Sequence, residues 1–356
     1  MTAPRIAVVV PCYNTSSRCA DVIARAAPLA DAILAVDDGS TDDTAEHLRA
    51  SGCRVLHLPV NAGKGAALAA GFREVLKGPD GALGARADYV VTMDGDGQHD
   101  PADIPRLVDC ARRSGADLVL GFRDPRSMPR KNRIGAHFSR LLFLIGTSTF
   151  VADTQSGFRL LSFPLVTALI DRVTWKGYET ESEVLWRALA LEGTVSAVEI
   201  STIYVDGNRR TQFNAWRDSA RIASVFTGQL RWTVSMAMLD FAIFAGLALP
   251  GSLSPACANV ASRLVAVACQ ATFRRDYGAR TRRLVRREGL GWCLLAFGGH
   301  LAATTTLVVT LVGLGVQPIL AKAAAQLVGY LGTFAAVDHV LLARMSRGLD
   351  REHHRM

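Results

Sequence analysis

Short apolar runs alternate with longer helical stretches along the first third of this chain, and this alternation is the strongest constraint on its fold. The runs expected to form strands are residues 6–11, 32–36, 55–59, 89–93 and 117–122. Strands separated by helices pair in parallel, because a parallel pair needs a long crossover connection. The sequence therefore predicts an α/β domain with a mainly parallel sheet and helices on both faces.

Hydropathy divides the chain near Trp232. Apolar and charged residues mix in globular proportions before this residue, whereas four apolar stretches follow it, at about 233–249, 255–273, 289–313 and 318–342. A helix of about twenty apolar residues crosses a bilayer, so we expect four membrane spans. The predicted domains are 1–232, which ends in an amphipathic juxtamembrane segment, an all-α four-helix transmembrane domain at 233–345, and a basic tail at 346–356.

Composition and charge restrict the function. Hydrophobic residues make up 49% of the chain and charged residues 20%, which excludes a disordered or fibrous protein. The formal net charge is +8, but seven arginines lie between Arg274 and Arg287, flanked by apolar stretches. Such a loop orients a membrane protein and does not indicate nucleic acid. By the positive-inside rule we expect a plasma-membrane protein whose N-terminal domain, arginine loop and tail are cytoplasmic.

Cysteine spacing and the N-terminus add two negative expectations. The seven cysteines contain no C-x-x-C pair, which argues against a disulfide framework and a zinc site. The first residues lead directly into a strand pattern, so no cleavable signal sequence is expected.

Two acidic clusters follow predicted strands, at the sheet end where ligands bind in folds of this class. Asp94-Gly95-Asp96 comes after the fourth run, and Asp37-Asp38 after the second. Paired carboxylates can hold Mg²⁺ together with the phosphates of a substrate. Either cluster alone would indicate only a polar turn or a helix cap, but their common position favours a binding site. Gly63-Lys64-Gly65 matches neither the P-loop nor the dinucleotide fingerprint.

Six motifs carry a family resemblance. They are VVVPCYN, AVDDGSTDDT, NAGKGAALAAG, MDGDGQHDP, DTQSGFRL and GYETESEVL, in this order over about residues 5–232. They resemble inverting family-2 glycosyltransferases of the polyprenyl-phosphate type, which includes dolichol-phosphate mannose synthase. The segment from Ser235 to Leu342 resembles the GtrA-like membrane domain through SMAMLDF, ANVASR and ILAKAAAQLVGY. The resemblance implies a nucleotide-sugar-binding fold of the GT-A type and a metal-dependent hexosyltransferase.

The same resemblance implies roles for single residues. The donor pocket would be lined by Pro11, Tyr13, Asn14, Asp38, Asp94 and Gly95, with Arg209 or Arg210 on the phosphates. Asp96 and Gln98 would ligate Mg²⁺ or Mn²⁺. The implied catalytic residues are Asp96, Arg123, which would hold phosphates, and Asp153, which would face the reacting centre. Thr15 stands where relatives often carry Glu, so the details of the nucleotide contacts stay open.

These observations predict transfer of one hexose from a donor of the GDP-mannose or UDP-glucose type to a polyprenyl phosphate, undecaprenyl or dolichyl, at the cytoplasmic membrane face. Two alternatives remain open: a processive polysaccharide synthase, and a non-catalytic flippase or scaffold for lipid-linked sugars. Gln229-Leu230-Arg231-Trp232 is one residue shorter than the Q-x-x-R-W motif of processive synthases, which favours a single transfer. Membrane lipid is an expected partner, nucleic acid is not, and homo-oligomerisation is left open.

The remaining charged residues also give expectations. At least two of Glu179, Glu181 and Glu183, on a helical stretch, are expected to be solvated or structural. Asp240 and Arg263 lie near the middles of adjacent predicted spans, where charges are costly and usually paired. They are expected to form either a structural ion pair or part of a phosphate path, whereas Lys322 is expected to reach the outer membrane face.

Overall fold

The computed structural model describes residues 3–78, 87–123, 133, 136–137, 139–140, 143, 151–177, 179–203, 227–273 and 290–329. The chain divides into two compact units, unit 1 at residues 1–226 and unit 2 at residues 227–356. Each unit is described by itself. The expected arginine loop and the basic tail lie outside the described residues.

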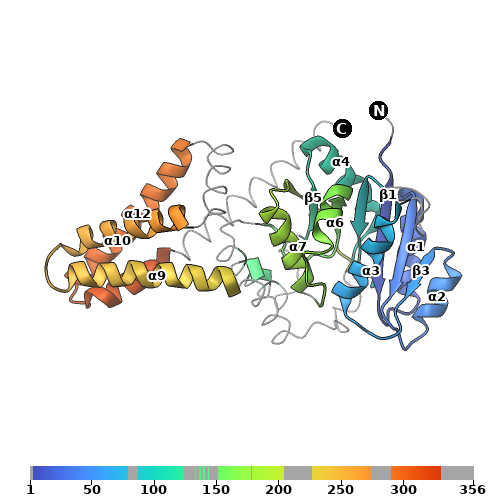
Figure 1. Cartoon of the computed structure of the whole chain (residues 1–356), viewed down its shortest axis with the longest axis horizontal. Coiled ribbons are helices and arrows are strands. Elements are labelled where there is room, and N and C mark those ends of the chain that lie inside the picture. Colours follow the sequence, from blue (N-terminus) through green and yellow to red (C-terminus); the bar gives the residue numbers. More distant parts are fainter. Residues whose placement is uncertain are drawn as a thin grey trace. The chain divides into compact units, whose positions relative to one another are not determined.

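The described part of unit 1 contains one seven-stranded sheet in the order β3-β2-β1-β4-β6-β5-β7 (Figure 1). The strands are β1 (Ile6–Cys12), β2 (Ala32–Asp37), β3 (Arg54–His57), β4 (Tyr89–Thr92), β5 (Leu118–Phe122), β6 (Arg159–Ser162) and β7 (Val195–Glu199). All neighbouring strands in it pair in parallel except β6, which is antiparallel to β4 and β5. The carboxyl ends of β2, β1 and β4 therefore meet at one end of the sheet.

Helices cover both faces of this sheet (Figure 1). They are α1 (Arg18–Ala26), η1 (Ala27–Leu29), α2 (Thr44–Ala50), α3 (Lys64–Leu76), η3 (Pro101–Asp103), α4 (Ile104–Ser114), α6 (Phe163–Leu169) and α7 (Glu179–Ala190). Val8 and Val10 of β1 pack with α1, α2 and α4, whereas Val9 packs with α3, α6 and α7. Because β1 is buried on both faces, its sequence is a continuous apolar run rather than an alternation.

The prediction of an α/β fold with a mainly parallel sheet is confirmed, and β6 and β7 add to it. The four residues of β6 begin with Arg159, a charged side chain that is buried in the structure. Neither the length nor the composition of this segment indicates a strand, so tertiary pairing with β4 and β5 determines it.

Unit 2 is helical. Its described helices are α9 (Thr227–Ala248), α10 (Pro255–Phe273), α12 (Leu290–Gly313) and residues 318–329. Their side chains form a small apolar core around Phe244, Ala258, Val308 and Ala325. Within the described residues, no helix combines the length and the apolar character that crossing a membrane requires.

This finding does not support the expected spans at 233–249, 255–273 and 289–313, and the span at 318–342 lies partly outside the described residues. The apolar residues of these helices are interrupted by a charged residue in α9 (Asp240) and in α10 (Arg263), and by glycines, His300 and threonines in α12.

Asp240 and Arg263 do form an ion pair, whereas the expected position of Lys322 was wrong. Lys322 is fully buried and does not extend to a surface: its ammonium lies 2.9 Å from the carboxylate of Asp240. Arg263 is only the second cation of Asp240, at 3.5 Å.

Candidate active site

The loops that follow β1 and β2 are tied together by side chains. Asn14 has a positive φ of 50°, and its backbone N–H donates to the hydroxyl of Ser40 at 3.1 Å. Its side-chain Oδ1 accepts from the backbone N–H of Thr41 at 2.9 Å. Tyr13, half-buried, lies on the same loop. Two residues of the predicted nucleotide pocket therefore lie on a loop that is braced against the second acidic strand end.

Asp38 lies on that second strand end and is buried. Its two carboxylate oxygens accept from the backbone N–H groups of Ala62 and Gly63, each at 2.8 Å. Burial raises the pKa of Asp38, and these two hydrogen bonds oppose the rise. In the structure Asp38 thus positions the loop before α3 at the edge of the predicted pocket.

The turn after β4 packs directly against the end of β1. The N–H of Gly95 donates to the carbonyl of Pro11 at 3.3 Å. A Cβ on Gly95 would lie 2.7 Å from Cys12 Sγ and 3.2 Å from Pro11 O, so a larger residue would push the two strand ends apart. Glycine between Asp94 and Asp96 is therefore required by close packing.

Lys64, at the start of α3, lies between two carboxylates from other elements. Its Nζ is 2.6 Å from Asp94 Oδ1, at the end of β4, and 2.7 Å from Glu181 Oε1, in the first turn of α7. His99 contacts the second oxygen of Asp94 at 3.4 Å. We call Lys64, Asp94, Asp96, Glu181 and His99 the acidic cluster.

The charges in the acidic cluster shift each other's titration. Burial lowers the pKa of Lys64, but the carboxylates of Asp94 and Glu181 outweigh burial and hold that pKa above its usual value. Burial raises the pKa of Asp94, but Lys64 and His99 outweigh burial. The pKa of Asp94 therefore lies well below its usual value, and the side chain stays ionised.

Asp96 completes the acidic cluster. Its Oδ1 accepts from the backbone N–H of Gln98 at 3.0 Å, so the main chain of Gln98 holds this carboxylate. The predicted role of Gln98 as a metal ligand stays a prediction. Burial and the charge of Asp94 raise the pKa of Asp96. Lys64 contacts the carboxylates of Asp94 and Glu181, whereas Asp96 forms no ion pair with a described residue. Asp96 is therefore the carboxylate of this cluster without a paired cation among the described residues.

A divalent cation fits this donor set. Mg²⁺ is usually bound through one or two carboxylates together with substrate phosphates rather than inside a cage of protein ligands. The described residues hold no group of three or more His, Cys, Asp and Glu side chains converging on one metal position. Asp94 and Asp96 are the residues that would hold the ion.

Arg123 and Asp153 are paired with each other. The guanidinium donates from Nε at 2.8 Å and from Nη2 at 3.2 Å, and the N–H groups of Gln155 and Ser156 add two donors to the same carboxylate. Burial raises the pKa of Asp153, but Arg123 outweighs burial and the pKa lies below its usual value. The structure thus pairs Arg123, which follows β5, with Asp153. The sequence predicts separate roles for these two residues.

The loop at residues 153–158 encloses the acidic cluster. Arg159 is buried and donates to the carbonyls of Ser156, Glu181 and Thr154 at 2.7, 2.6 and 2.9 Å. A Cβ on Gly157 would lie 2.7 Å from both carboxylate oxygens of Asp94 and from Lys64 Nζ. The acidic cluster therefore packs against the DTQSGFRL motif.

Sequence reasoning missed Lys64, Arg159 and the pairing role of Glu181. Glu179, Glu181 and Glu183 are all buried, so of the predicted solvated or structural roles only the structural alternative remains. Glu183 has a structural role, accepting from the N–H of Thr174 at 3.0 Å. The available signal was the motifs themselves, since NAGKG, DTQSGFR and GYETE each supply one of these residues. Arg209 and Arg210 lie outside the described residues.

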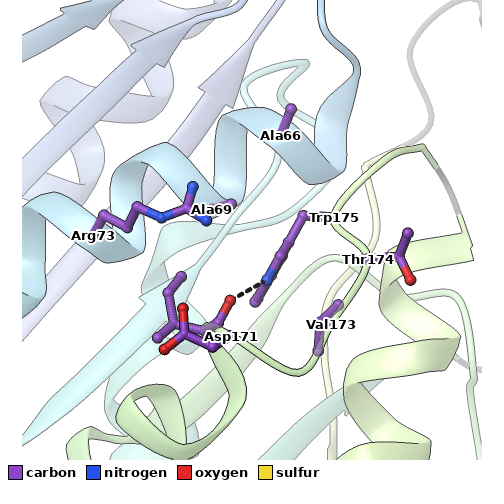
Figure 2. Close-up of a pocket in the computed structure, with 8 residues that line it drawn as sticks. Ala66, Ala69, Arg73, Asp171, Val173, Thr174 and Trp175 are labelled. Carbon is purple, nitrogen blue, oxygen red and sulfur yellow. Dashed lines mark hydrogen bonds between the residues drawn. The ribbon is translucent and has the colours of Figure 1, made fainter.

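A separate cavity of about 390 Å³ lies between α3 and the segment that follows α6 (Figure 2). It is lined by Ala66, Ala69, Arg73, Ile170, Asp171, Val173, Thr174 and Trp175. Figure 2 shows the Trp175 indole donating into this segment, to the carbonyl of Ile170 at 2.8 Å. None of the predicted site residues lines the cavity, and the chemistry-bearing side chains gather at the strand ends instead.

Comparison with known proteins agrees with this architecture. The sequence model of "Glycosyl transferase family 2" matches residues 7–162. The polyprenol monophosphomannose synthase of Mycolicibacterium smegmatis is 30% identical over 221 residues, which cover 57% of this chain and 78% of that protein. An uncharacterized protein of Methanocaldococcus jannaschii is 30% identical over 207 residues, 56% of this chain and 82% of that protein.

Two further proteins are similar. The undecaprenyl-phosphate mannosyltransferase of Micrococcus luteus is 29% identical over 217 residues, 56% of this chain and 84% of that protein. The crystal structure of glucosyl-3-phosphoglycerate synthase from Mycobacterium tuberculosis with UDP covers 64% of this chain and 81% of that chain, with a TM-score of 0.52 at 24% identity. This likeness shows a shared fold, the predicted GT-A-like α/β architecture.

Proposed function

Because this chain belongs to glycosyl transferase family 2, we propose that it transfers a single hexose, with inversion, from a nucleotide sugar to a polyprenyl phosphate. Relatives named for polyprenol and undecaprenyl-phosphate mannosyl transfer support this acceptor. The observation that carries the proposal is the acidic cluster at the end of β4, where Asp94, Asp96 and Glu181 gather and Lys64 contacts Asp94 and Glu181. Neither the hexose nor the nucleotide is specified by these contacts.

The donor reacts by losing a nucleoside diphosphate. A bound Mg²⁺ or Mn²⁺ supplies positive charge that stabilises this leaving group. Asp94 and Asp96 would hold the ion, and Lys64 and Gly157 keep Asp94 in place. The loop carrying Tyr13 and Asn14 borders the nucleotide.

The acceptor needs little activation. A phosphate monoester is already ionised near neutral pH, so a strong general base is dispensable. Asp153 stays a carboxylate because Arg123 lowers its pKa. Its charge stabilises the positive character that develops on the sugar, and the same ion pair orients the acceptor phosphate through Arg123.

The proposed reaction takes place at the cytoplasmic face of a membrane. The reason is chemical, since a polyprenyl chain resides in lipid whereas a nucleotide sugar is dissolved in the cytosol. The membrane association is tested by fractionating cells that express the full chain and measuring the protein in the membrane and soluble fractions.

The test of the function is product analysis. The purified full chain is incubated with UDP- or GDP-hexoses, polyprenyl phosphate and Mg²⁺, and the products are identified by mass spectrometry. One hexose per lipid phosphate is the expected product. A polymer would instead indicate a processive synthase, and no turnover with any donor would overturn the proposal.

The matched variants are Asp96→Asn and Asp100→Asn. The first removes a carboxylate from the acidic cluster and should lower the rate by at least about a hundredfold, and EDTA should do the same to the wild type. The second changes a nearby carboxylate that caps η3 and pairs with Arg25 on the surface, so activity should be retained. Both variants should remain folded.

A further inference from the structure

Unit 2 contains a buried polar cluster, here called the Lys322 cluster: Lys322, Asp240, Asn259, Ser262 and Gln326. The ammonium of Lys322 donates to Asp240 Oδ1 at 2.9 Å, Asn259 Oδ1 at 2.8 Å and Ser262 Oγ at 3.0 Å. Gln326 donates to the other oxygen of Asp240. The three donors of the ammonium all have acceptors, so the Lys322 cluster is self-sufficient.

Arg263, beside this cluster, has donor groups without hydrogen-bond partners among the described residues. Its Nη1 lies 3.5 Å from Asp240 Oδ2, a carboxylate already engaged by Lys322 and Gln326. Its Nε and Nη2 are buried and have no hydrogen-bond partner among the described residues. The side chain as a whole is 11% exposed, so part of it reaches the surface of the unit.

The charges in these helices do not balance. Asp240 is the only acidic residue in α9, α10, α12 and residues 318–329, whereas Arg263 and Lys322 are both cationic and largely buried. A buried charge without a counterion is costly. One more anion beside Arg263 would remove this cost.

The free atoms specify the shape of that anion. Nε–H and Nη2–H lie side by side on one edge of a guanidinium and donate in parallel, which matches two oxygens of a phosphate or carboxylate. An ammonium could not make this paired contact.

We propose that the Nε–Nη2 edge of Arg263 binds the phosphate of a phosphomonoester, which is either a lipid headgroup or free phosphate. For the lipid source the inference rests on the proposed function, which makes a polyprenyl phosphate the substrate of unit 1. Unit 2 then has a phosphate site of its own, and Asp240 serves to hold Lys322 rather than to exchange with the ligand.

Hydrogen exchange of the full chain, measured by mass spectrometry, tests the site. The probes are detergent-solubilised polyprenyl monophosphate, inorganic phosphate and uncharged polyprenol. A phosphate probe at a hundred times its dissociation constant should slow exchange in α10 by up to about a hundredfold, and polyprenol should have no effect. Slowing by the lipid alone identifies a headgroup site, and slowing by both phosphates identifies a site for the phosphate group itself.

The variants are Arg263→Gln, which removes the charge, and Arg263→Lys, which keeps the charge but loses the paired edge. Both should abolish the slowing, whereas Arg172→Gln, at an exposed arginine of unit 1, should keep it. Without probe, α10 in Arg263→Gln should exchange no faster than in the wild type, because the cation that is lost shares its carboxylate, Asp240, with Lys322.

Three results would overturn the site: slowing that persists in Arg263→Lys, equal slowing by polyprenol, or no slowing by either phosphate. Transfer assays are run in parallel. Normal transfer without slowing of α10 rejects this site alone, whereas slowing by inorganic phosphate without any transfer rejects the proposed function alone.

Discussion

Lys64 is the residue with the greatest effect on the acidic cluster. Lys64, in α3, forms ion pairs with Asp94, at the end of β4, and with Glu181, in α7. Less than a fifth of its side chain is exposed, so water replaces these contacts poorly. Removing one partner of a buried ion pair leaves an uncompensated charge and is strongly destabilising.

Replacing Lys64 with methionine should therefore destabilise unit 1 by about 3 kcal/mol. Glu181→Gln should cost less in that background than in the wild type, because Lys64 is then absent and no ammonium loses a partner. The double-mutant cycle should give a coupling energy of about 1 kcal/mol or more, measured by hydrogen exchange in α3 and α7. Strictly additive effects would show that the two side chains do not interact.

At the scale of elements, the Arg123–Asp153 pair joins the end of β5 to the loop before β6. The pKa of Asp153 is lower in the folded protein than in the unfolded chain. The unfolded chain therefore binds the proton first as pH falls, and the pair contributes stability above about pH 4 that is lost at lower pH.

This linkage predicts an acid-sensitive region. Amide exchange in β5 and β6 of the wild type should accelerate as pH falls below about 4, after correction for the intrinsic exchange rate. Arg123→Met should make this pH dependence flatter, because burial then raises the pKa of Asp153 towards or above its unfolded value. An unchanged pH dependence in the variant would mean that Arg123 is not what lowers this pKa.

At the scale of the whole molecule, the two units have buried cores of different kinds. Unit 1 has an extensive apolar core on each face of its sheet, whereas the described apolar core of unit 2 is small and lies in the same helices as the Lys322 cluster. Charge pairing therefore carries more of the organisation of unit 2.

Asp240→Ala should accordingly destabilise unit 2 by about 3–5 kcal/mol, because it leaves Lys322 buried without a counterion. Hydrogen exchange should accelerate in α9 and α10, and β1 and β4 of unit 1 serve as the internal control. Asn259→Ala is the milder comparison, since it removes a neutral acceptor and should cost about 1–2 kcal/mol. Equal effects of the two variants would contradict the importance of the charge.

Local chemistry was enough to predict most of unit 1. Continuous apolar runs such as Ile6–Val10 report burial on both faces, and helices between them force parallel pairing. The positions of Asp38, Asp94 and Asp96 followed, because residues after parallel strands collect at one end of the sheet.

Only the tertiary structure decided which charges meet. Lys64, Asp94 and Glu181 come from three distant segments, and Lys322 is far along the chain from its partner Asp240. A charge looks solvated in a sequence whenever its partner is far along the chain, which is why the position of Lys322 was misjudged and the partner of Glu181 was missed. Sequence by itself determined the fold class and the strand ends that carry the site, because burial periodicity and connection length are local. Charge pairing depends on distances across the fold, and these exist only once the helices have packed.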